Sequence, residues 1–71
     1  MKLNYYGDTD SLYIDLNSKP SFETREVAEG LLVDFDKEGH VVGIDIDRAS
    51  TLLVLNKLEL THLPLVEIKA A

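Results

Sequence analysis

The segment GLLVDFDKEGHVVGIDIDRAS, which runs from Gly30 to Ser50, contains two apolar alternations separated by an acidic turn. Leu31–Phe35 and Val41–Ile46 both repeat with a period of two, which predicts a pair of strands. Asp36–Gly39 closes the predicted hairpin with a glycine in the left-handed conformation, which costs glycine no steric strain. Gly43 interrupts the second strand, and this predicts either a bulge or a tyrosine or phenylalanine ring that covers the gap.

The hydrophobic period changes after this hairpin. Asp47 is a favoured N-cap residue, and the leucines that follow it form an apolar face, so a short helix is expected from about Asp47 to Leu55. Within that helix the run Leu52–Leu55 is apolar on all sides and would need cover from the sheet or from a second subunit. A strand over the same run is the alternative interpretation.

Upstream of the hairpin, three further segments favour strands. Lys2–Tyr6 and Ser11–Leu16 flank a glycine- and aspartate-rich turn and predict a first hairpin. Asn17–Pro20 is expected to be a loop, because proline removes a backbone donor and asparagine bonds its own backbone. Phe22–Val27 predicts a third strand of weaker alternation.

The expected fold class is α+β and mainly β: an antiparallel meander of four to five strands with one short C-terminal helix packed on the sheet. Alternation also predicts which side chains face inward. These are Leu12, Ile14, Leu31 or Leu32, Val33, Phe35, Val42, Ile44, Ile46, Leu52 and Leu53.

The length of 71 residues predicts one small domain, residues 1–71. About residues 57–71 form an apolar extension, in which Val66–Lys69 is compatible with a last edge strand or with a mobile tail. Exposed leucines in such number would favour aggregation unless a partner covered them, so this tail is a predicted interface.

Composition restricts the classes of function. The formal net charge of −6 disfavours binding to nucleic acid or to an anionic membrane and favours a basic protein partner. The absence of cysteine excludes disulfides and thiolate metal sites, which leaves oligomerisation as the expected supplement to a small core. Met1–Tyr6 shows no apolar run typical of a signal peptide, so a soluble cytoplasmic protein is expected.

The acidic hairpin is the sharpest candidate for a metal site. Asp34, Asp36, Glu38 and Asp45 have spacings that resemble the oxygen ligands of an EF-hand calcium loop. A true EF-hand loop requires a helix on each side, whereas the flanking residues here favour strands. The alternative is a hairpin whose turn happens to be acidic, and on balance no metal ligand is assigned.

Clustered carboxylates provide the second chemical candidate. Asp8 and Asp10 could act with Asp36 as a general acid and base if the fold brought them together. Aspartates in turns usually bond the local backbone, which is the competing explanation. His40 and His62 are expected to be solvated, and no catalytic or cofactor-binding residue is assigned.

Two further residue types have structural explanations. Ser50 lacks the G-x-S-x-G context of a nucleophile and is expected in the first turn of the helix. Tyr5, Tyr6 and Tyr13 lie among aspartates rather than basic residues, so sheet packing or a protein interface is expected of them rather than stacking on nucleic acid.

Two motifs together resemble a known family. They are Tyr6-x-x-x-Asp10-Ser11-Leu12-Tyr13-Ile14-x-Leu16, and Gly30-x-x-x-Asp34-Phe35-Asp36-x-x-Gly39-x-Val41-Val42-Gly43-Ile44-Asp45-Ile46 followed by Ala49-Ser50. From about Lys2 to Leu53 the chain resembles domain of unknown function 2283, DUF2283. The resemblance implies a small antiparallel sheet with a short helix, found in bacteria and archaea, without an established activity. It also implies gene neighbourhoods that contain a small toxin, and hence an antitoxin-like role.

The leading hypothesis is therefore a non-enzymatic protein-interaction module that forms a homodimer and engages a small basic protein. The alternatives are a weak calcium site at the acidic hairpin and an enzyme that uses clustered carboxylates.

Overall fold

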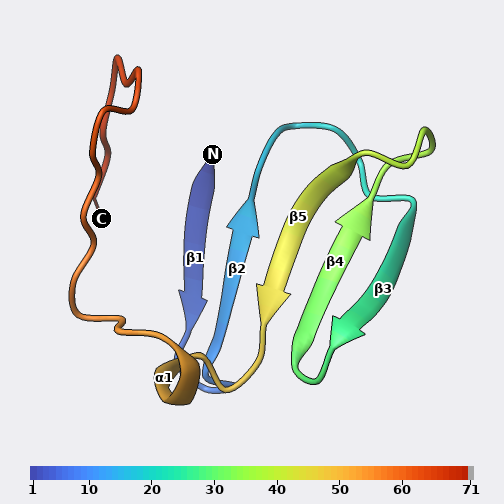
Figure 1. The fold of residues 1–71 in the computed structure, drawn as a ribbon, viewed down its shortest axis with the longest axis horizontal. Coiled ribbons are helices and arrows are strands. Elements are labelled where there is room, and N and C mark those ends of the chain that lie inside the picture. The colour runs from blue at the N-terminus through green and yellow to red at the C-terminus, as the bar shows by residue number, and fades with distance from the viewer. Residues whose placement is uncertain (71) are drawn as a thin grey trace.

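The computed structural model describes residues 1–70, and in this part of the chain five antiparallel strands form one sheet with one short helix beside it (Figure 1). The predicted mainly β fold is confirmed. The elements are β1 (Lys2–Tyr6), β2 (Ser11–Asp15), β3 (Glu23–Ala28), β4 (Leu31–Phe35), β5 (Val41–Ile46) and α1 (Ala49–Leu52).

The strand order in the sheet is β1-β2-β5-β4-β3, which departs from a meander at one connection. Residues 16–22 cross the end of the sheet and place β3 at the far edge, after which β4 and β5 fold back until β5 pairs with β2 (Figure 1). Three inter-strand spacings amount to about 14 Å. Seven extended residues reach further than that, so the loop spans the distance without strain.

The cross-strand register gives the sheet two chemically different faces, because directly opposed residues point to the same side. Leu12 opposes Ile46, and Ile44 opposes both Ile14 and Val33. The apolar face, as it is called below, consists of Leu3, Leu12, Ile14, Leu31, Val33, Phe35, Val42, Ile44 and Ile46. The acidic face includes Lys2, Asn4, Tyr13, Asp15, Thr24, Glu26, Leu32, Asp34, Gly43 and Asp45.

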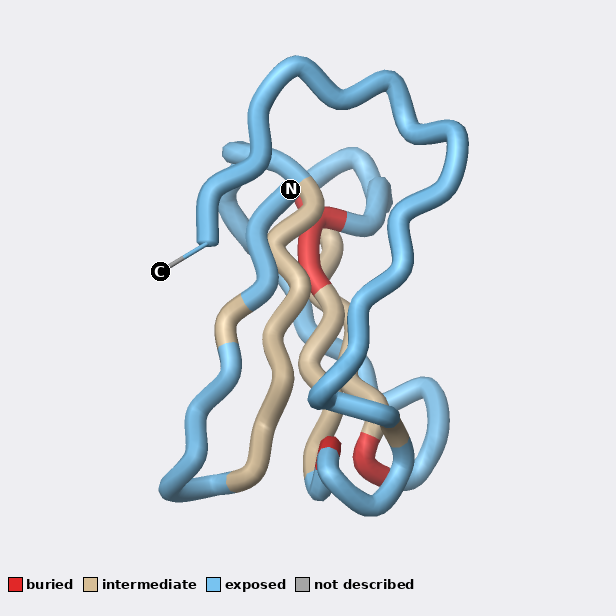
Figure 2. The backbone as a smooth tube through the Cα atoms, turned by 90° about the vertical axis from the view of Figure 1, so that its left-hand side faces the viewer, coloured by how far each residue is buried: buried red, intermediate tan, exposed pale blue. Residues whose placement is uncertain are grey.

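Little of the apolar face is buried. Among the described residues, the buried hydrophobic ones are Val42 and Ala49, whereas the other side chains of this face within the central strands β2, β4 and β5 are half-buried. Figure 2 shows the same distribution along the backbone. The alternation predicted the members of this face other than Leu3, and the register resolves the open choice between Leu31 and Leu32 in favour of Leu31. The expected inward position of Leu52 is wrong, since this side chain is 61% exposed.

The helix α1 is shorter than predicted and begins differently. Arg48, in the left-handed conformation, occupies the N-cap position that was expected for Asp47, and it makes no side-chain capping bond. After Leu52 the chain becomes extended at Leu53. A four-residue helix depends on tertiary packing rather than on propensity, and the following leucines have no neighbouring face on which to pack.

A carboxylate from the first hairpin substitutes for the missing cap. Asp10, in the turn between β1 and β2, accepts hydrogen bonds from the backbone N–H and the hydroxyl of Ser50, the latter at 2.7 Å. Its backbone carbonyl accepts a bond from the N–H of Ala49 at 2.8 Å. These contacts fasten α1 to the end of the sheet where β1 turns into β2 (Figure 1).

The segment after α1, residues 53–70, forms neither helix nor strand, so no edge strand forms at Val66–Lys69. It extends past β1 on the outer side of the sheet (Figure 1) and lines a groove with Met1–Asn4. Leu53 is half-buried, and the later leucines are exposed, including Leu58, Leu60, Leu63 and Leu65. Among residues 1–70, no helix has the length and apolar character needed to cross a membrane.

Candidate functional site: the acidic face

A tyrosine in the second strand links three other strands on the acidic face. The hydroxyl of Tyr13 in β2 donates a hydrogen bond to Asp34 Oδ2 in β4 at 2.7 Å. The hydroxyl of Thr24 in β3 donates to Asp34 Oδ1. Because β5 lies between β2 and β4, the tyrosine ring must cross that strand to reach its acceptor.

Gly43 makes this crossing possible. A Cβ atom at position 43 would lie 2.0 Å from the hydroxyl oxygen of Tyr13 and 2.7 Å from its ring carbon Cζ, distances that no side chain tolerates. The register of β4 and β5 also shifts beside Gly43, between Asp34 and Phe35. Both predictions for Gly43, a covering ring and a bulge, are thus confirmed.

Three carboxylates surround the Tyr13 hydroxyl. The hydrogen bond to Asp34, with burial and the charges of Asp15 and Asp45 adding to it, raises the pKa of Tyr13 to about 12. Burial, followed by the charges of Asp47 and Asp34, raises the pKa of Asp45 above its ordinary value. Asp45 Oδ1 is buried and accepts no hydrogen bond from the described residues. Lys2 opposes Asp15 in the β1–β2 register, but among residues 1–70 no basic side chain forms an ion pair with Asp15, Asp34 or Asp45.

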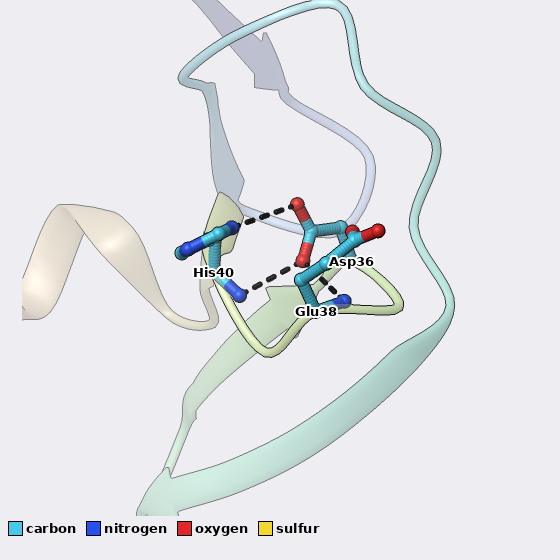
Figure 3. Close-up of side chains that lie close together, drawn as sticks. All are labelled: Asp36, Glu38 and His40. Atoms are coloured by element: carbon cyan, nitrogen blue, oxygen red, sulfur yellow. Dashed lines mark hydrogen bonds and ion pairs between the residues drawn. The ribbon is translucent and has the colours of Figure 1, made fainter.

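The turn between β4 and β5 forms a separate, smaller cluster (Figure 3). Asp36 is only 5% exposed, and its Oδ1 accepts backbone hydrogen bonds from Glu38 at 2.9 Å and from His40 at 2.8 Å. His40 Nδ1 lies 3.4 Å from Asp36 Oδ2. The backbone bond from His40 lowers the pKa of Asp36. Gly39 takes the left-handed conformation predicted for it, with φ of 86°.

This geometry does not assemble the calcium ligands suggested by the spacing. Within residues 1–70, ligand atoms of Asp36, Glu38 and His40 lie within 4.8 Å of one another, and this group includes neither Asp34 nor Asp45. Asp34 is engaged by Tyr13 and Thr24 on the acidic face, and Asp45 lies within β5. Asp36 already serves to close its own turn.

The carboxylates considered for acid and base chemistry are also apart. Asp8 and Asp10 lie in the turn at one end of the sheet, whereas Asp36 lies in the turn at the opposite end (Figure 1). The carboxylate of Asp10 binds Tyr5 and Ser50, which confirms Ser50 as a residue of the first helical turn. His62 is exposed, and the side chain of His40 is largely exposed beside Asp36.

Sequence reasoning did not find the contacts of Tyr13 with Asp34 and Thr24. The tyrosines are close in sequence but have different partners. The hydroxyl of Tyr5 donates a hydrogen bond to Asp10, whereas the ring of Tyr13 crosses β5 and its hydroxyl donates to Asp34 in β4. A usable signal was present, because Tyr13 alternates with Leu12 and Ile14 and must face away from them. Only the pairing of β2 with β5 brings it over Gly43.

Comparison with known proteins confirms the family resemblance. Residues 2–50 match the family described as Protein of unknown function (DUF2283). The chain is 35% identical over 60 residues to Uncharacterized protein MJ0789 of Methanocaldococcus jannaschii, which covers 84% of the chain and 51% of the relative. The chain thus spans about half the length of this curated relative. No solved structure matches this chain. The matched residues contain all five strands and therefore the whole acidic face.

Proposed function

We propose that this chain, which belongs to the DUF2283 family of proteins of unknown function, is a non-enzymatic, cytoplasmic interaction module that forms a homodimer and binds a small basic protein through its acidic face. One observation carries the proposal of a basic partner. Asp15, Asp34 and Asp45 gather around Tyr13, and a buried oxygen of Asp45 has no hydrogen-bond donor among residues 1–70.

A basic side chain from a partner would supply what this face lacks. An unpaired carboxylate oxygen away from water raises the free energy of the folded chain. Asp45 Oδ1 is covered by the chain itself, so a partner's guanidinium or ammonium group would pair with the other oxygen of the same carboxylate and lower the cost of its charge. The net charge of −6 also attracts a basic protein from a distance and accelerates the encounter. Charge complementarity of this kind supports an antitoxin-like partner role, in which the chain covers a basic surface of a small protein.

Two pairs of substitutions with matched net charge test the proposal. Asp15→Asn with Asp45→Asn removes two charges from the acidic face, whereas Asp8→Asn with Glu59→Gln removes two charges elsewhere. Each double variant changes the net charge from −6 to −4. The probe is a small basic protein recovered from the native host on the immobilised chain and then purified.

Isothermal titration calorimetry of that purified protein gives the measurement. We expect the acidic-face pair to weaken binding by at least about tenfold and the control pair by no more than about threefold, because close charge pairs contribute more than remote ones. Equal losses for the two pairs would show that only the overall charge matters. Failure to recover any basic protein that binds the purified chain would reject the proposed partner.

A further inference from the structure

Within residues 1–70, no second layer covers the apolar face of the sheet as one normally covers such a face. A sheet that is apolar on one side buries that side against a helix or another sheet. Here α1 lies at one end of the sheet, and residues 53–70 extend past its β1 edge (Figure 1). Ile14, Val33 and Ile44 lie in the three central strands and stay half-buried.

The total exposed area indicates how much surface remains to be covered. A compact monomer of 7.9 kDa exposes about 4,400 Å², whereas this chain exposes 5860 Å². The excess of about 1,450 Å² matches the area that each subunit buries in an obligate homodimer, which is roughly 1,000–2,500 Å². The exposed apolar residues after α1 contribute part of this excess, and the half-buried side chains of the apolar face contribute another part.

The distribution of charge indicates what can pack on the apolar face. Two copies that each carry a net charge of −6 repel one another, and this repulsion is smallest when they meet through surfaces that hold few acidic groups. Asp15, Asp34 and Asp45 all lie on the opposite face. The charged residues that alternate onto the apolar side of β3 are Glu23 and Arg25, and Arg25 lies 4.0 Å over the ring of Phe35.

Resting on the homodimer proposed above, we infer that the occupant of the apolar face is the same face of a second copy. Two such sheets pack face to face about 10 Å apart, with Ile14, Val33 and Ile44 near the centre of the contact. In a dimer with two-fold symmetry both subunits contribute the same patch, so the apolar face alone can form the whole interface. Both acidic faces then point outward and stay free for a basic partner.

Neighbouring residues in β4 provide a matched pair of variants. Val33 lies on the apolar face and Leu32 on the acidic face, and both are half-buried in the same strand. Val33→Lys places a charge in the proposed interface, whereas Leu32→Lys places the same charge beside Asp45 on the outer face. A third variant, Leu58→Asp, alters the exposed segment after α1.

Light scattering coupled to size exclusion and sedimentation equilibrium measure the mass of each full-length variant. We expect twice the chain mass of 7.9 kDa for the unmodified chain and for Leu32→Lys and Leu58→Asp. Val33→Lys should raise the dimer dissociation constant by at least about 100-fold, because it buries an unpaired charge. If Val33→Lys does not fold, thermal unfolding of the unmodified chain tests whether it is a dimer. The Tm of an obligate dimer rises with protein concentration, whereas the Tm of a monomer does not.

Three outcomes overturn the inference. They are a monomeric unmodified chain whose Tm does not depend on concentration, a dimer that Leu32→Lys dissociates as readily as Val33→Lys, and a dimer lost only in Leu58→Asp. The first would assign the apolar face to the chain's own residues 53–70, and the third would make that segment the interface. A monomer that still binds the basic protein through Asp15 and Asp45 would reject this interface alone.

Discussion

At the scale of single residues, the decisive contact is the one between Tyr13 and Gly43. The tyrosine ring occupies the space that any other side chain at position 43 would need. This contact allows one hydroxyl in β2 to reach a carboxylate two strands away in β4. A single glycine therefore determines whether the charged groups of the acidic face are held in one arrangement.

We expect Gly43→Ala to lower the free energy of unfolding by about 2 kcal/mol, because the ring of Tyr13 must move and its bond to Asp34 breaks. Chemical denaturation measures this change. Gly7→Ala is the control, since a Cβ there would meet its nearest neighbour at an ordinary 3.8 Å and should change stability by less than about 0.5 kcal/mol.

A double-mutant cycle identifies the cause of the loss. In a Tyr13→Ala background the ring is absent, so Gly43→Ala should cost much less than in the unmodified chain. Additive losses from the two substitutions would show that backbone strain at position 43, rather than the ring, explains the requirement for glycine.

The alternation of residues predicted this contact only in part. A glycine inside a strand indicates that something large lies over it, and the pattern correctly suggested a tyrosine or phenylalanine. It did not identify Tyr13, because the ring comes from β2, a strand that pairs with β5 but is remote from it in sequence. The neighbour of Gly43 in β2 is more than 25 residues away along the chain.

At the scale of elements, the strands were easier to predict than the helix. The limits of β1, β4 and β5 agree with the alternation, β2 ends one residue earlier than predicted, and β3 is shifted by one residue at both ends. Each strand has a clear period of two and a turn on either side. The prediction of the helix limits failed for two reasons. The apolar residues after Leu52 lack a packing surface within residues 1–70, and the carboxylate that caps the helix belongs to Asp10, which is remote in sequence.

We expect Asp10→Asn to lower the Tm by roughly 5 °C at neutral pH, since it weakens the bonds that start α1. The Ser50 hydroxyl and then the Tyr5 hydroxyl lower the pKa of Asp10 in the folded chain. A carboxylate with a lowered pKa stabilises the fold above its unfolded pKa of about 4, and this contribution disappears as the pH falls below that value.

Thermal unfolding at several pH values measures both effects. The difference in Tm between the unmodified chain and Asp10→Asn should be largest at neutral pH and should shrink below about pH 4. Asp8→Asn, in the same turn, is the control for loss of one negative charge. A difference that persists unchanged into acid would mean that the ionised carboxylate does not cause it, and no difference at neutral pH would mean that the Asp10 backbone carbonyl, which the variant keeps, holds the helix.

At the scale of the whole molecule, the order of strands could not be read from local patterns. The pairing of β2 with β5 depends on a loop that skips two strands, and nothing in the alternation of either strand specifies its neighbour. The consequence is functional. This pairing collects Asp15 and Asp45 from β2 and β5 on one face and leaves the opposite face of these strands apolar, so that an acidic surface and a largely apolar surface lie back to back.

The two surfaces should respond oppositely to salt. Added salt screens the repulsion between two copies that each carry −6 and leaves apolar burial intact, so self-association should strengthen. The same screening should weaken binding of a basic protein to the acidic face, because that attraction is electrostatic. We expect at least a threefold change in each dissociation constant, in opposite directions, between about 0.05 M and 0.5 M sodium chloride.

Sedimentation equilibrium measures the first dissociation constant and calorimetry the second, in the same buffers. Sodium sulfate is the control, because a salt that is excluded from apolar surfaces should strengthen self-association further at equal ionic strength. If salt weakens self-association, the two copies meet through charged groups and the apolar face is not their interface. If salt leaves binding of the basic protein unchanged, the carboxylates around Tyr13 do not provide the attraction, and the acidic face is a consequence of strand order alone.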